Sequence, residues 1–210
     1  MNNIATELWL LNQFRSYFVN DEFAKNLSLT DIVTEFIQTK IIEYIATQDY
    51  GNKMTLIWWT SLRLLYNWIR KTRDLDYDSE DLSKDKLIEI CDDIIKYLQS
   101  SWYIINKNND WYFYTNCNEH TMCETIYHCR FEVKTSFLKD NKNYIIDSEV
   151  QIRIKMDIKD GIWDYNKEYI TPLRQVYWIP VLTARIDSLL SKKISWFLWR
   201  THTNSIAKDL

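Results

Sequence analysis

The stretch Val150-Gln151-Ile152-Arg153-Ile154-Lys155-Met156-Asp157-Ile158 alternates strictly between apolar and polar residues. Such alternation indicates a β-strand with one buried and one solvated face, because successive side chains of a strand point to opposite sides of the sheet. A second alternating stretch runs from Tyr127 to Phe137. The two stretches predict two long strands that pair as an antiparallel hairpin.

Upstream of these strands, the apolar residues follow the spacing of helices. Residues 4–14 and 28–51 each place apolar side chains three to four positions apart, which puts them on one helical face. Ser28 or Thr30 is suited to cap the second of these helices, and Gly51 is placed to end it. The first part of the chain is therefore expected to be helical.

Three further helices are expected along the chain. Residues 52–71 are apolar around most of a helix circumference and predict a buried, central helix. Another helix is expected to start near Ser83. The last is expected to run from Pro180, a residue favoured at the first helical position, to about Trp199.

An acidic stretch separates the helix of residues 52–71 from the one that starts near Ser83. Asp74, Asp76 and Asp78 stand at alternate positions and resemble the first ligands of a calcium-binding EF-hand loop. Serine replaces the glycine that such a loop needs at its sixth position, and aspartate replaces the glutamate at its twelfth. We therefore expect a solvated acidic connector, which is favourable before the N-terminus of the following helix.

These patterns together predict an α+β chain. A helical region that ends in a helix–hairpin unit, residues 1–116, is expected to precede an antiparallel β-hairpin or small sheet with a C-terminal helix, residues 117–210. No internal repeat or low-complexity linker separates the two regions. The alternative is that both form one continuous domain.

Glycine is scarce, and this scarcity excludes several kinds of site. Gly51 and Gly161 are the only glycines among 210 residues. A dinucleotide-binding GxGxxG loop, a phosphate-cradling GxxxxGK(S/T) loop and a GxSxG nucleophile elbow each need two or more glycines within a few residues. Because these signatures of enzymes are absent, we expect a protein that is not an enzyme.

One segment has the order of elements of a known DNA-associated fold. After a helix come a strand over residues 102–105, a polar tip and a strand over residues 111–114. This order resembles the third helix and wing of a winged-helix domain, with residues 55–71 as its first helix and 78–82 as its second. The resemblance covers about residues 55–116.

The exposed face of the expected third helix is acidic, with Glu89, Asp92 and Asp93. Carboxylates would repel the phosphates that dominate affinity for DNA. The resemblance therefore implies a member of the family that binds proteins. Such members serve as accessory subunits of ATPase or DNA-processing assemblies.

A short segment concentrates cysteine and histidine. Thirteen residues contain Cys117, His120, Cys123, His128 and Cys129. Thiolates and imidazoles at these spacings supply enough ligands for a tetrahedral zinc site. Its candidate ligands are Cys117, His120, Cys123 and Cys129. The alternative is that the Cys129 side chain faces the protein core from its strand, which would leave the zinc site incomplete. No other cofactor is expected.

Basic residues are candidates for contact with nucleic acid. They are Lys107 at the tip of the first hairpin and Arg153, Lys155 and Lys159 on one strand face. The net charge is nevertheless −3 and the pI about 5.7, unlike the basic charge of many nucleic-acid binders. We expect contact with nucleic acid to be indirect, and direct binding through these residues is the alternative.

Aromatic residues are abundant, with 10 Trp and 14 Tyr. Trp and Tyr are enriched at the hot spots of interfaces. Trp196 and Trp199, flanked by Lys192, Lys193 and Arg200, are therefore candidates for contact with a partner. The alternative is that their helix packs on the chain's own sheet.

The sequence as a whole favours a non-catalytic protein-interaction subunit, winged-helix-like and part of a larger ATPase or DNA-processing assembly of bacterial or phage origin. The alternatives are a direct nucleic-acid-binding protein and a small zinc-stabilised interaction protein of a virus or host. We expect a protein partner, with self-association as an alternative. A cytoplasmic location is expected, because the chain shows no secretory signal and no apolar stretch long enough to span a membrane.

Overall fold

The computed structural model describes residues 9, 12–13, 16, 27–70, 72, 74–100, 103–106, 112–116, 124–135, 151–160, 165–172 and 179–202. Its elements are, in order, α2 (Leu29–Thr47), the 3-10 helix η2 (Gly51–Lys53), β1 (Met54–Ile57), α3 (Trp58–Leu65), β2 (Asp74–Ser79), α4 (Lys84–Ser100), β3 (Tyr103–Asn106), β4 (Tyr112–Asn116), β5 (Glu124–Thr135), β6 (Gln151–Asp160), β7 (Lys167–Ile170), β8 (Val181–Ala184) and α5 (Ile186–His202). The predicted α+β class, with its C-terminal helix, is confirmed.

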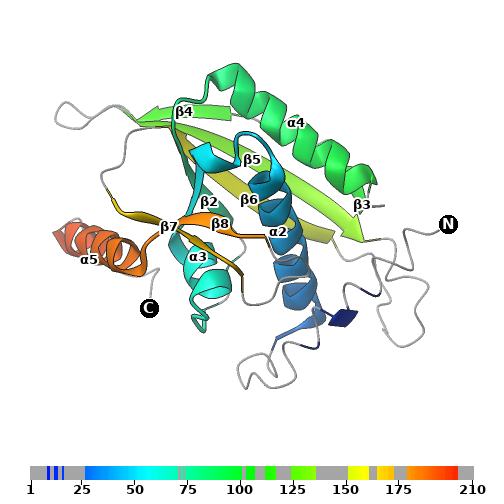
Figure 1. Cartoon of the computed structure of the whole chain (residues 1–210), viewed down its shortest axis with the longest axis horizontal. Coiled ribbons are helices and arrows are strands. Elements are labelled where there is room, and N and C mark those ends of the chain that lie inside the picture. Colours follow the sequence, from blue (N-terminus) through cyan, green and yellow to red (C-terminus); the bar gives the residue numbers. More distant parts are fainter. Residues whose placement is uncertain are drawn as a thin grey trace.

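The strands form one mixed sheet, in the order β3-β5-β6-β2-β1-β8-β7, and β4 also pairs with β5. The long antiparallel pair predicted from the alternating stretches is confirmed, since β5 and β6 pair from Thr125–Asp160 to Lys134–Gln151. β2 runs parallel to β6 and antiparallel to β1. Figure 1 shows β5 and β6 as the longest strands, with α2 and α4 together on one side of the molecule and α5 on the other.

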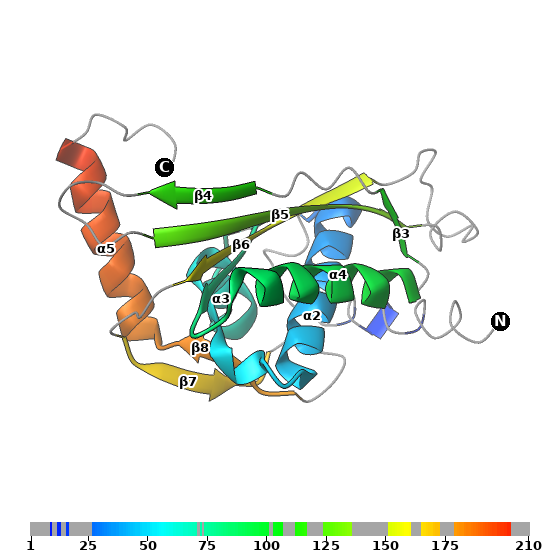
Figure 2. The same ribbon diagram turned by 90° about the horizontal axis from the view of Figure 1, so that it is seen from above.

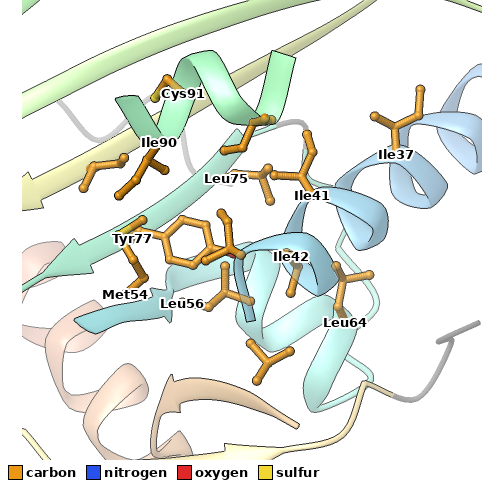
Figure 3. Packing of buried hydrophobic residues seen from close by; sticks show 14 of the residues in the cluster. Ile37, Ile41, Ile42, Met54, Leu56, Leu64, Leu75, Tyr77, Ile90 and Cys91 are labelled. Carbon is orange, nitrogen blue, oxygen red and sulfur yellow. The ribbon is translucent and has the colours of Figure 1, made fainter. Parts of the chain in front are cut away.

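Buried side chains pack on both faces of the central strands. The larger cluster joins α2 and α4 to the sheet through Leu56 of β1 and Leu75 and Tyr77 of β2. Figure 3 shows Leu75 and Tyr77 pointing toward the residues of α2 and α4. A smaller cluster on the opposite face joins α3 and α5 to Ile57 of β1 and Ala184 of β8. Figure 2 shows α5 well apart from α2 and α4.

The helix expected over residues 52–71 is wrong in its first part and its length. Residues 54–57 form the strand β1, and the helix α3 that follows ends at Leu65. All four residues of β1 are buried, so the strand has no solvated side. A short apolar run of this kind does not distinguish a buried strand from a buried helix by its period.

The solvated acidic connector is also wrong, because residues 74–79 form strand β2 in the middle of the sheet. The residues that alternate with the three aspartates along the strand are Leu75 and Tyr77, and both are buried. The alternation of acidic and apolar residues is therefore the period of a strand and not a set of loop ligands. An extended strand cannot fold around an ion as an EF-hand loop does.

The strands expected at residues 102–105 and 111–114 exist as β3 and β4, but each pairs with β5. Residues 78–79, expected at the start of a short second helix, end strand β2. The predicted helix from Ser83 is confirmed as α4, where the Lys86 backbone N–H donates to the Ser83 hydroxyl oxygen over 3.2 Å. The resemblance to winged-helix domains stays a prediction from the sequence.

The N-terminal end of α2 is as the sequence indicated, and its C-terminal end is not. Ser28 caps the helix as predicted, in a capping box with Asp31. Gln48 is the C-cap, and Gly51 lies three residues beyond in η2. A Cβ atom on Gly51 would lie 2.6 Å from the Ile45 carbonyl oxygen, so glycine is required there by close backbone approach and not by a positive φ.

The last helix begins later than expected. Residues 181–184 form strand β8, which is completely buried between β1 and β7, and α5 starts at Ile186. Apolar Val181 and Leu182 therefore belong to the sheet and not to a helix. Within the described residues, no helix is long and apolar enough to cross a membrane.

Candidate functional site

Asp74, Asp76 and Asp78 form what we call the acidic face of β2. They alternate with Leu75 and Tyr77, which fill the core on the side of α2 and α4. The pleat of the strand therefore turns the three carboxylates to the side of α3 and α5. Burial deepens along the strand, since Asp74 is exposed, Asp76 half-buried and Asp78 buried. Two of the three aspartate side chains, Asp74 and Asp76, are thus in contact with solvent.

The turn from β1 into α3 lies beside the acidic face. Ile57, the N-cap residue of α3, is paired with Asp76 across the β1–β2 ladder. No side chain caps the first turn of α3. Backbone N–H groups of a first helical turn and the positive end of the helix dipole attract anions. Carboxylates and an anion-attracting helix end therefore meet at one point of the sheet.

Hydrogen bonds fix α3 on the strand ends. The Thr60 hydroxyl donates to the Asp74 carbonyl oxygen. The hydroxyl oxygens of Ser61 and Thr183 lie 2.6 Å apart, and the Thr183 hydroxyl donates to the Leu56 carbonyl over 2.8 Å. These contacts attach the first turn of α3 to β1, β2 and β8 together.

The turn itself is strained. Trp58 has a φ of 61°, in the left-handed region that large side chains rarely adopt. Such a backbone costs about 1–3 kcal/mol and persists only where the surroundings enforce it. Trp58 and Trp59 are both half-buried and pack against the smaller core cluster, which supplies that enforcement.

Cations lie over these two indole rings. The Lys193 Nζ atom is 4.3 Å from the ring centroid of Trp58 and 4.6 Å from that of Trp59. The guanidinium carbon of Arg70 is 4.3 Å from the Trp59 centroid. The pair Trp58–Trp59, which we call the tryptophan turn, therefore brings positive charge from α5 and from the segment after α3 to the edge of the acidic face.

Asp78 has a different role from the other two aspartates. It is 2% exposed and accepts a hydrogen bond of 2.7 Å from the Tyr165 hydroxyl. The Lys192 Nζ atom lies 3.6 Å from the same carboxylate oxygen and 3.9 Å from the Tyr165 ring centroid. These three groups, which we call the α5 clasp, hold α5 against the sheet.

Burial and the neighbouring carboxylate of Asp78 raise the pKa of Tyr165 far above its ordinary value. Tyr165 therefore stays protonated at neutral pH and acts as a donor. Since its proton is committed to Asp78, Tyr165 is a structural group of the clasp. The positive charge at the tryptophan turn comes from Lys193 and Arg70.

β6 continues the acidic face on its other side. In the parallel pairing of β2 with β6, Asp74, Asp76 and Asp78 stand opposite Lys155, Asp157 and Lys159. Tyr77 and Ile158 are paired across the two strands, and both are buried in the larger cluster. The residue positions that alternate with them along β2 and β6 therefore belong to the opposite face of the sheet. Asp157 therefore occupies the position beside Asp76.

The oxygen donors of the acidic face fit a divalent cation such as Mg²⁺. This ion prefers carboxylate oxygens and is often held by one or two of them, together with substrate phosphates. Asp74 and Asp76 supply that number on one face of the strand. Among the described residues no group of three or more metal-ligating side chains is found.

The predicted zinc ligands remain a prediction. Cys117, His120 and Cys123 lie outside the described residues. Cys129 lies on β5, where it pairs with Met156 of β6. The free cysteine that the described part of the chain does show is Cys91, which is buried in the larger core cluster.

The predicted nucleic-acid contacts are separated in the same way. Lys107 lies outside the described residues. Arg153, Lys155 and Lys159 share one face of β6, as the alternation predicts, and two of them stand at register positions opposite Asp74 and Asp78. This face of β6 therefore adjoins the acidic face and is not a purely basic stripe.

The predicted partner residues Trp196 and Trp199 lie on α5, and contact with a partner stays a prediction. Four apolar side chains of the same helix are exposed at intervals of four residues, which places them on one helical face. They are Ile186, Leu190, Ile194 and Leu198.

Sequence reasoning missed the acidic face and the tryptophan turn. The signal for the first was present, because Leu75 and Tyr77 alternate with three aspartates over the length of a strand. For the second there was no local signal. That Trp58 and Trp59 meet Lys193 depends on the pairing of β1 with β8, which brings together residues more than a hundred positions apart.

No protein-family model matches the chain, and no curated protein sequence matches it. Among solved structures, the nucleotidyltransferase toxin MenT4 of Mycobacterium tuberculosis is similar, with a TM-score of 0.46 and 12% identity, over 80% of this chain and 53% of that one. JHP933 of Helicobacter pylori matches with a TM-score of 0.44 and 17% identity, over 80% of this chain and 58% of that one. The chain thus spans somewhat more than half the length of these structures.

These findings correct three expectations from the sequence. The expectations of a non-catalytic interaction subunit, of a protein that is not an enzyme and of an accessory component are wrong, because the structures similar to this chain include a nucleotidyltransferase. The absence of glycine-rich motifs excluded particular enzyme loops and not enzymes as a class.

Proposed function

We propose that this chain is a nucleotidyltransferase that binds a nucleoside triphosphate with a divalent cation at the acidic face. The observation that carries the proposal is the position of Asp74 and Asp76 on an open strand face beside the uncapped first turn of α3. Carboxylates and phosphates repel each other, so a site that offers carboxylates next to an anion-attracting helix end is suited to phosphate that carries a metal ion.

Different residues would bind the cation and the phosphates. Asp74 and Asp76 would hold the cation, with Asp157 at the neighbouring position of β6 as a third carboxylate. When bound, the cation supplies charge neutralisation of the phosphate oxygens in the transition state. The first turn of α3 and the Lys193 ammonium orient the phosphate chain, because both direct positive charge to the edge of the acidic face.

The reaction balances as a simple displacement. An acceptor hydroxyl oxygen attacks the α-phosphorus, the bond from that phosphorus to the oxygen bridging to the β-phosphate breaks, and pyrophosphate leaves. The proton of the acceptor hydroxyl passes to solvent or to a nearby carboxylate. Positioning and electrostatics supply most of the catalysis in reactions of this kind.

The α5 clasp, which includes Asp78, holds α5 in place next to this site. The buried carboxylate holds Lys192 and the Tyr165 hydroxyl, and α5 carries Lys193 one residue further. Asp78 is therefore a positioning residue for Lys193. It is not assigned to the metal ion, because its carboxylate is buried and accepts a hydrogen bond from the Tyr165 hydroxyl.

Transfer of labelled nucleotide tests the proposal. The protein is incubated with Mg²⁺ and a mixture of the four nucleoside triphosphates labelled at the α-phosphate, with total RNA and the protein itself as acceptors. We expect label in acceptor, and a loss of about 100-fold or more in Asp76→Asn, since one carboxylate of the cation site becomes a neutral amide.

The matched control is Asp92→Asn, the same chemical change on the exposed side of α4. It should transfer at the wild-type rate. Transfer that is equal in Asp76→Asn and in wild type would refute the assignment of the acidic face, and a folded wild-type protein that transfers no label to either acceptor would count against the proposed activity.

A further inference from the structure

We infer that the tryptophan turn binds the base of the nucleotide, with the Trp58 ring as the stacking surface. This inference rests on the proposed function and names a part of the substrate that the acidic face does not contact. A ribose alone separates a base from its phosphates, so a base site must lie directly beside the phosphate site. Ile57, which precedes Trp58, is paired with Asp76, and that places the turn where a base would have to lie.

The strained backbone is the first observation for this role. Asparagine or glycine would adopt a φ of 61° with less cost than the tryptophan that stands there, and packing against the smaller core cluster holds Trp58 in this conformation. Strain of this kind concentrates at ligand sites. In this chain it holds a large aromatic ring, half-buried, in the turn beside the acidic face.

The cation over the ring is the second observation. Lys193 contacts both rings of the turn at 4.3 and 4.6 Å. A cation–π contact at a half-exposed site contributes about two- to fivefold to an equilibrium. Stacking of a base on an aromatic side chain contributes about 5- to 150-fold in affinity. A base can therefore take the place of the ammonium on the Trp58 ring.

The displaced ammonium stays close to the phosphates that arrive with the base, because Lys193 lies on α5, which the α5 clasp holds beside the acidic face. Binding thus replaces the cation–π contacts of Lys193 with the two rings by a stacked base and an attraction between the ammonium and the phosphates. The Trp59 ring keeps the Arg70 guanidinium at 4.3 Å, so this ring stays in place as the wall of the site.

Calorimetric titration separates the base from the phosphates. Tripolyphosphate and ATP, each with Mg²⁺, are titrated into wild type, Trp58→Asn and Trp58→Phe. Asparagine keeps the left-handed backbone without a ring, and phenylalanine keeps a ring. We expect ATP to bind at least fivefold more tightly than tripolyphosphate in wild type, and Trp58→Asn to weaken ATP by fivefold or more while the Kd of tripolyphosphate changes less than twofold. Trp58→Phe should retain most of the ATP affinity.

Two controls make the outcome specific. Trp68→Asn changes an exposed tryptophan outside the turn and should leave both dissociation constants unchanged. Asp76→Asn should weaken both ligands. If tripolyphosphate and ATP bind wild type equally, or if Trp58→Asn weakens both alike, the base site is refuted while the proposed function stands. If neither ligand binds folded wild type, both are refuted.

Discussion

Tyr77 of β2 and Tyr165, which precedes β7, differ in what surrounds their hydroxyl groups. The Tyr77 hydroxyl is buried in the larger cluster without a hydrogen-bond partner, whereas the Tyr165 hydroxyl donates to Asp78 over 2.7 Å. An unpaired buried hydroxyl is costly, and a hydrogen bond to a charged group is stabilising. Tyr77→Phe should therefore raise the free energy of unfolding by up to about 1 kcal/mol, and Tyr165→Phe should lower it by about 1–3 kcal/mol. Urea unfolding measures both. A loss of stability in Tyr77→Phe, or no loss in Tyr165→Phe, would show that the two environments are misassigned.

The same residues give the stability of the protein a pH dependence. Burial raises the pKa of Tyr77 well above the ordinary tyrosine value of about 10, so the folded state keeps a proton that the unfolded state releases. This contribution is complete below pH 10 and is lost as the pH rises above it. The free energy of unfolding of wild type should fall as the pH rises above 10. In Tyr77→Phe this fall should be smaller, by up to about 1.4 kcal/mol per pH unit. Parallel declines in the two proteins between pH 10 and 11 would contradict this.

At the scale of elements, α2 and α3 are joined by a buried ion pair. The Arg63 Nε atom donates to a Glu35 carboxylate oxygen over 2.7 Å, and the two side chains are 1% and 3% exposed. Removing one member leaves an uncompensated charge, which costs about 3–5 kcal/mol. Arg63→Met should cost that much, and the double change Arg63→Met with Glu35→Leu should regain most of it.

The exposed pair of Lys86 and Glu89 on α4 is the control for this prediction. Its atoms are 3.0 Å apart on the helix surface, where water and salt screen the charges. Lys86→Met should leave the denaturant midpoint unchanged. If Arg63→Met is as mild as Lys86→Met, the pair does not hold α2 to α3.

Elements of high amphipathic contrast could be predicted from the sequence, and elements buried on both sides could not. α4, β5 and β6 each follow the apolar and polar period of their element in the sequence, and their existence follows from that period. β1 and β8 are buried throughout, so they have no solvated side to reveal the period. The sequence-based errors at residues 52–71 and 180–184 both arise in this way.

The candidate site could be predicted only in part for a related reason. Its carboxylates belong to one strand and could have been found from the alternation of Asp74, Leu75, Asp76 and Tyr77. Its cations come from Lys192 and Lys193, and they join it through strand pairings between β1, β2 and β8. Contacts of such sequence separation are not encoded in any local pattern.

For the molecule as a whole, a bound nucleotide should couple to stability. A ligand that binds the folded state alone stabilises it by about 2.7 kcal/mol at 100 times its Kd, which for a chain of this length is about 5–10 °C in Tm. Wild type should show this shift with ATP and Mg²⁺ and lose it when EDTA removes the cation. Asp76→Asn should show no shift. A full shift in Asp76→Asn would contradict the acidic face as the cation site.

The most direct test of the proposed activity is which phosphate the chain transfers. Two parallel reactions contain the same protein, Mg²⁺ and acceptors, one with ATP labelled at the α-phosphate and the other with ATP labelled at the γ-phosphate. Nucleotidyl transfer predicts that the α-label enters the acceptor and the γ-label leaves as pyrophosphate, with both signals lost in Asp76→Asn and kept in Asp92→Asn. A γ-label in the acceptor, or an α-label that enters equally well in Asp76→Asn, would contradict the account.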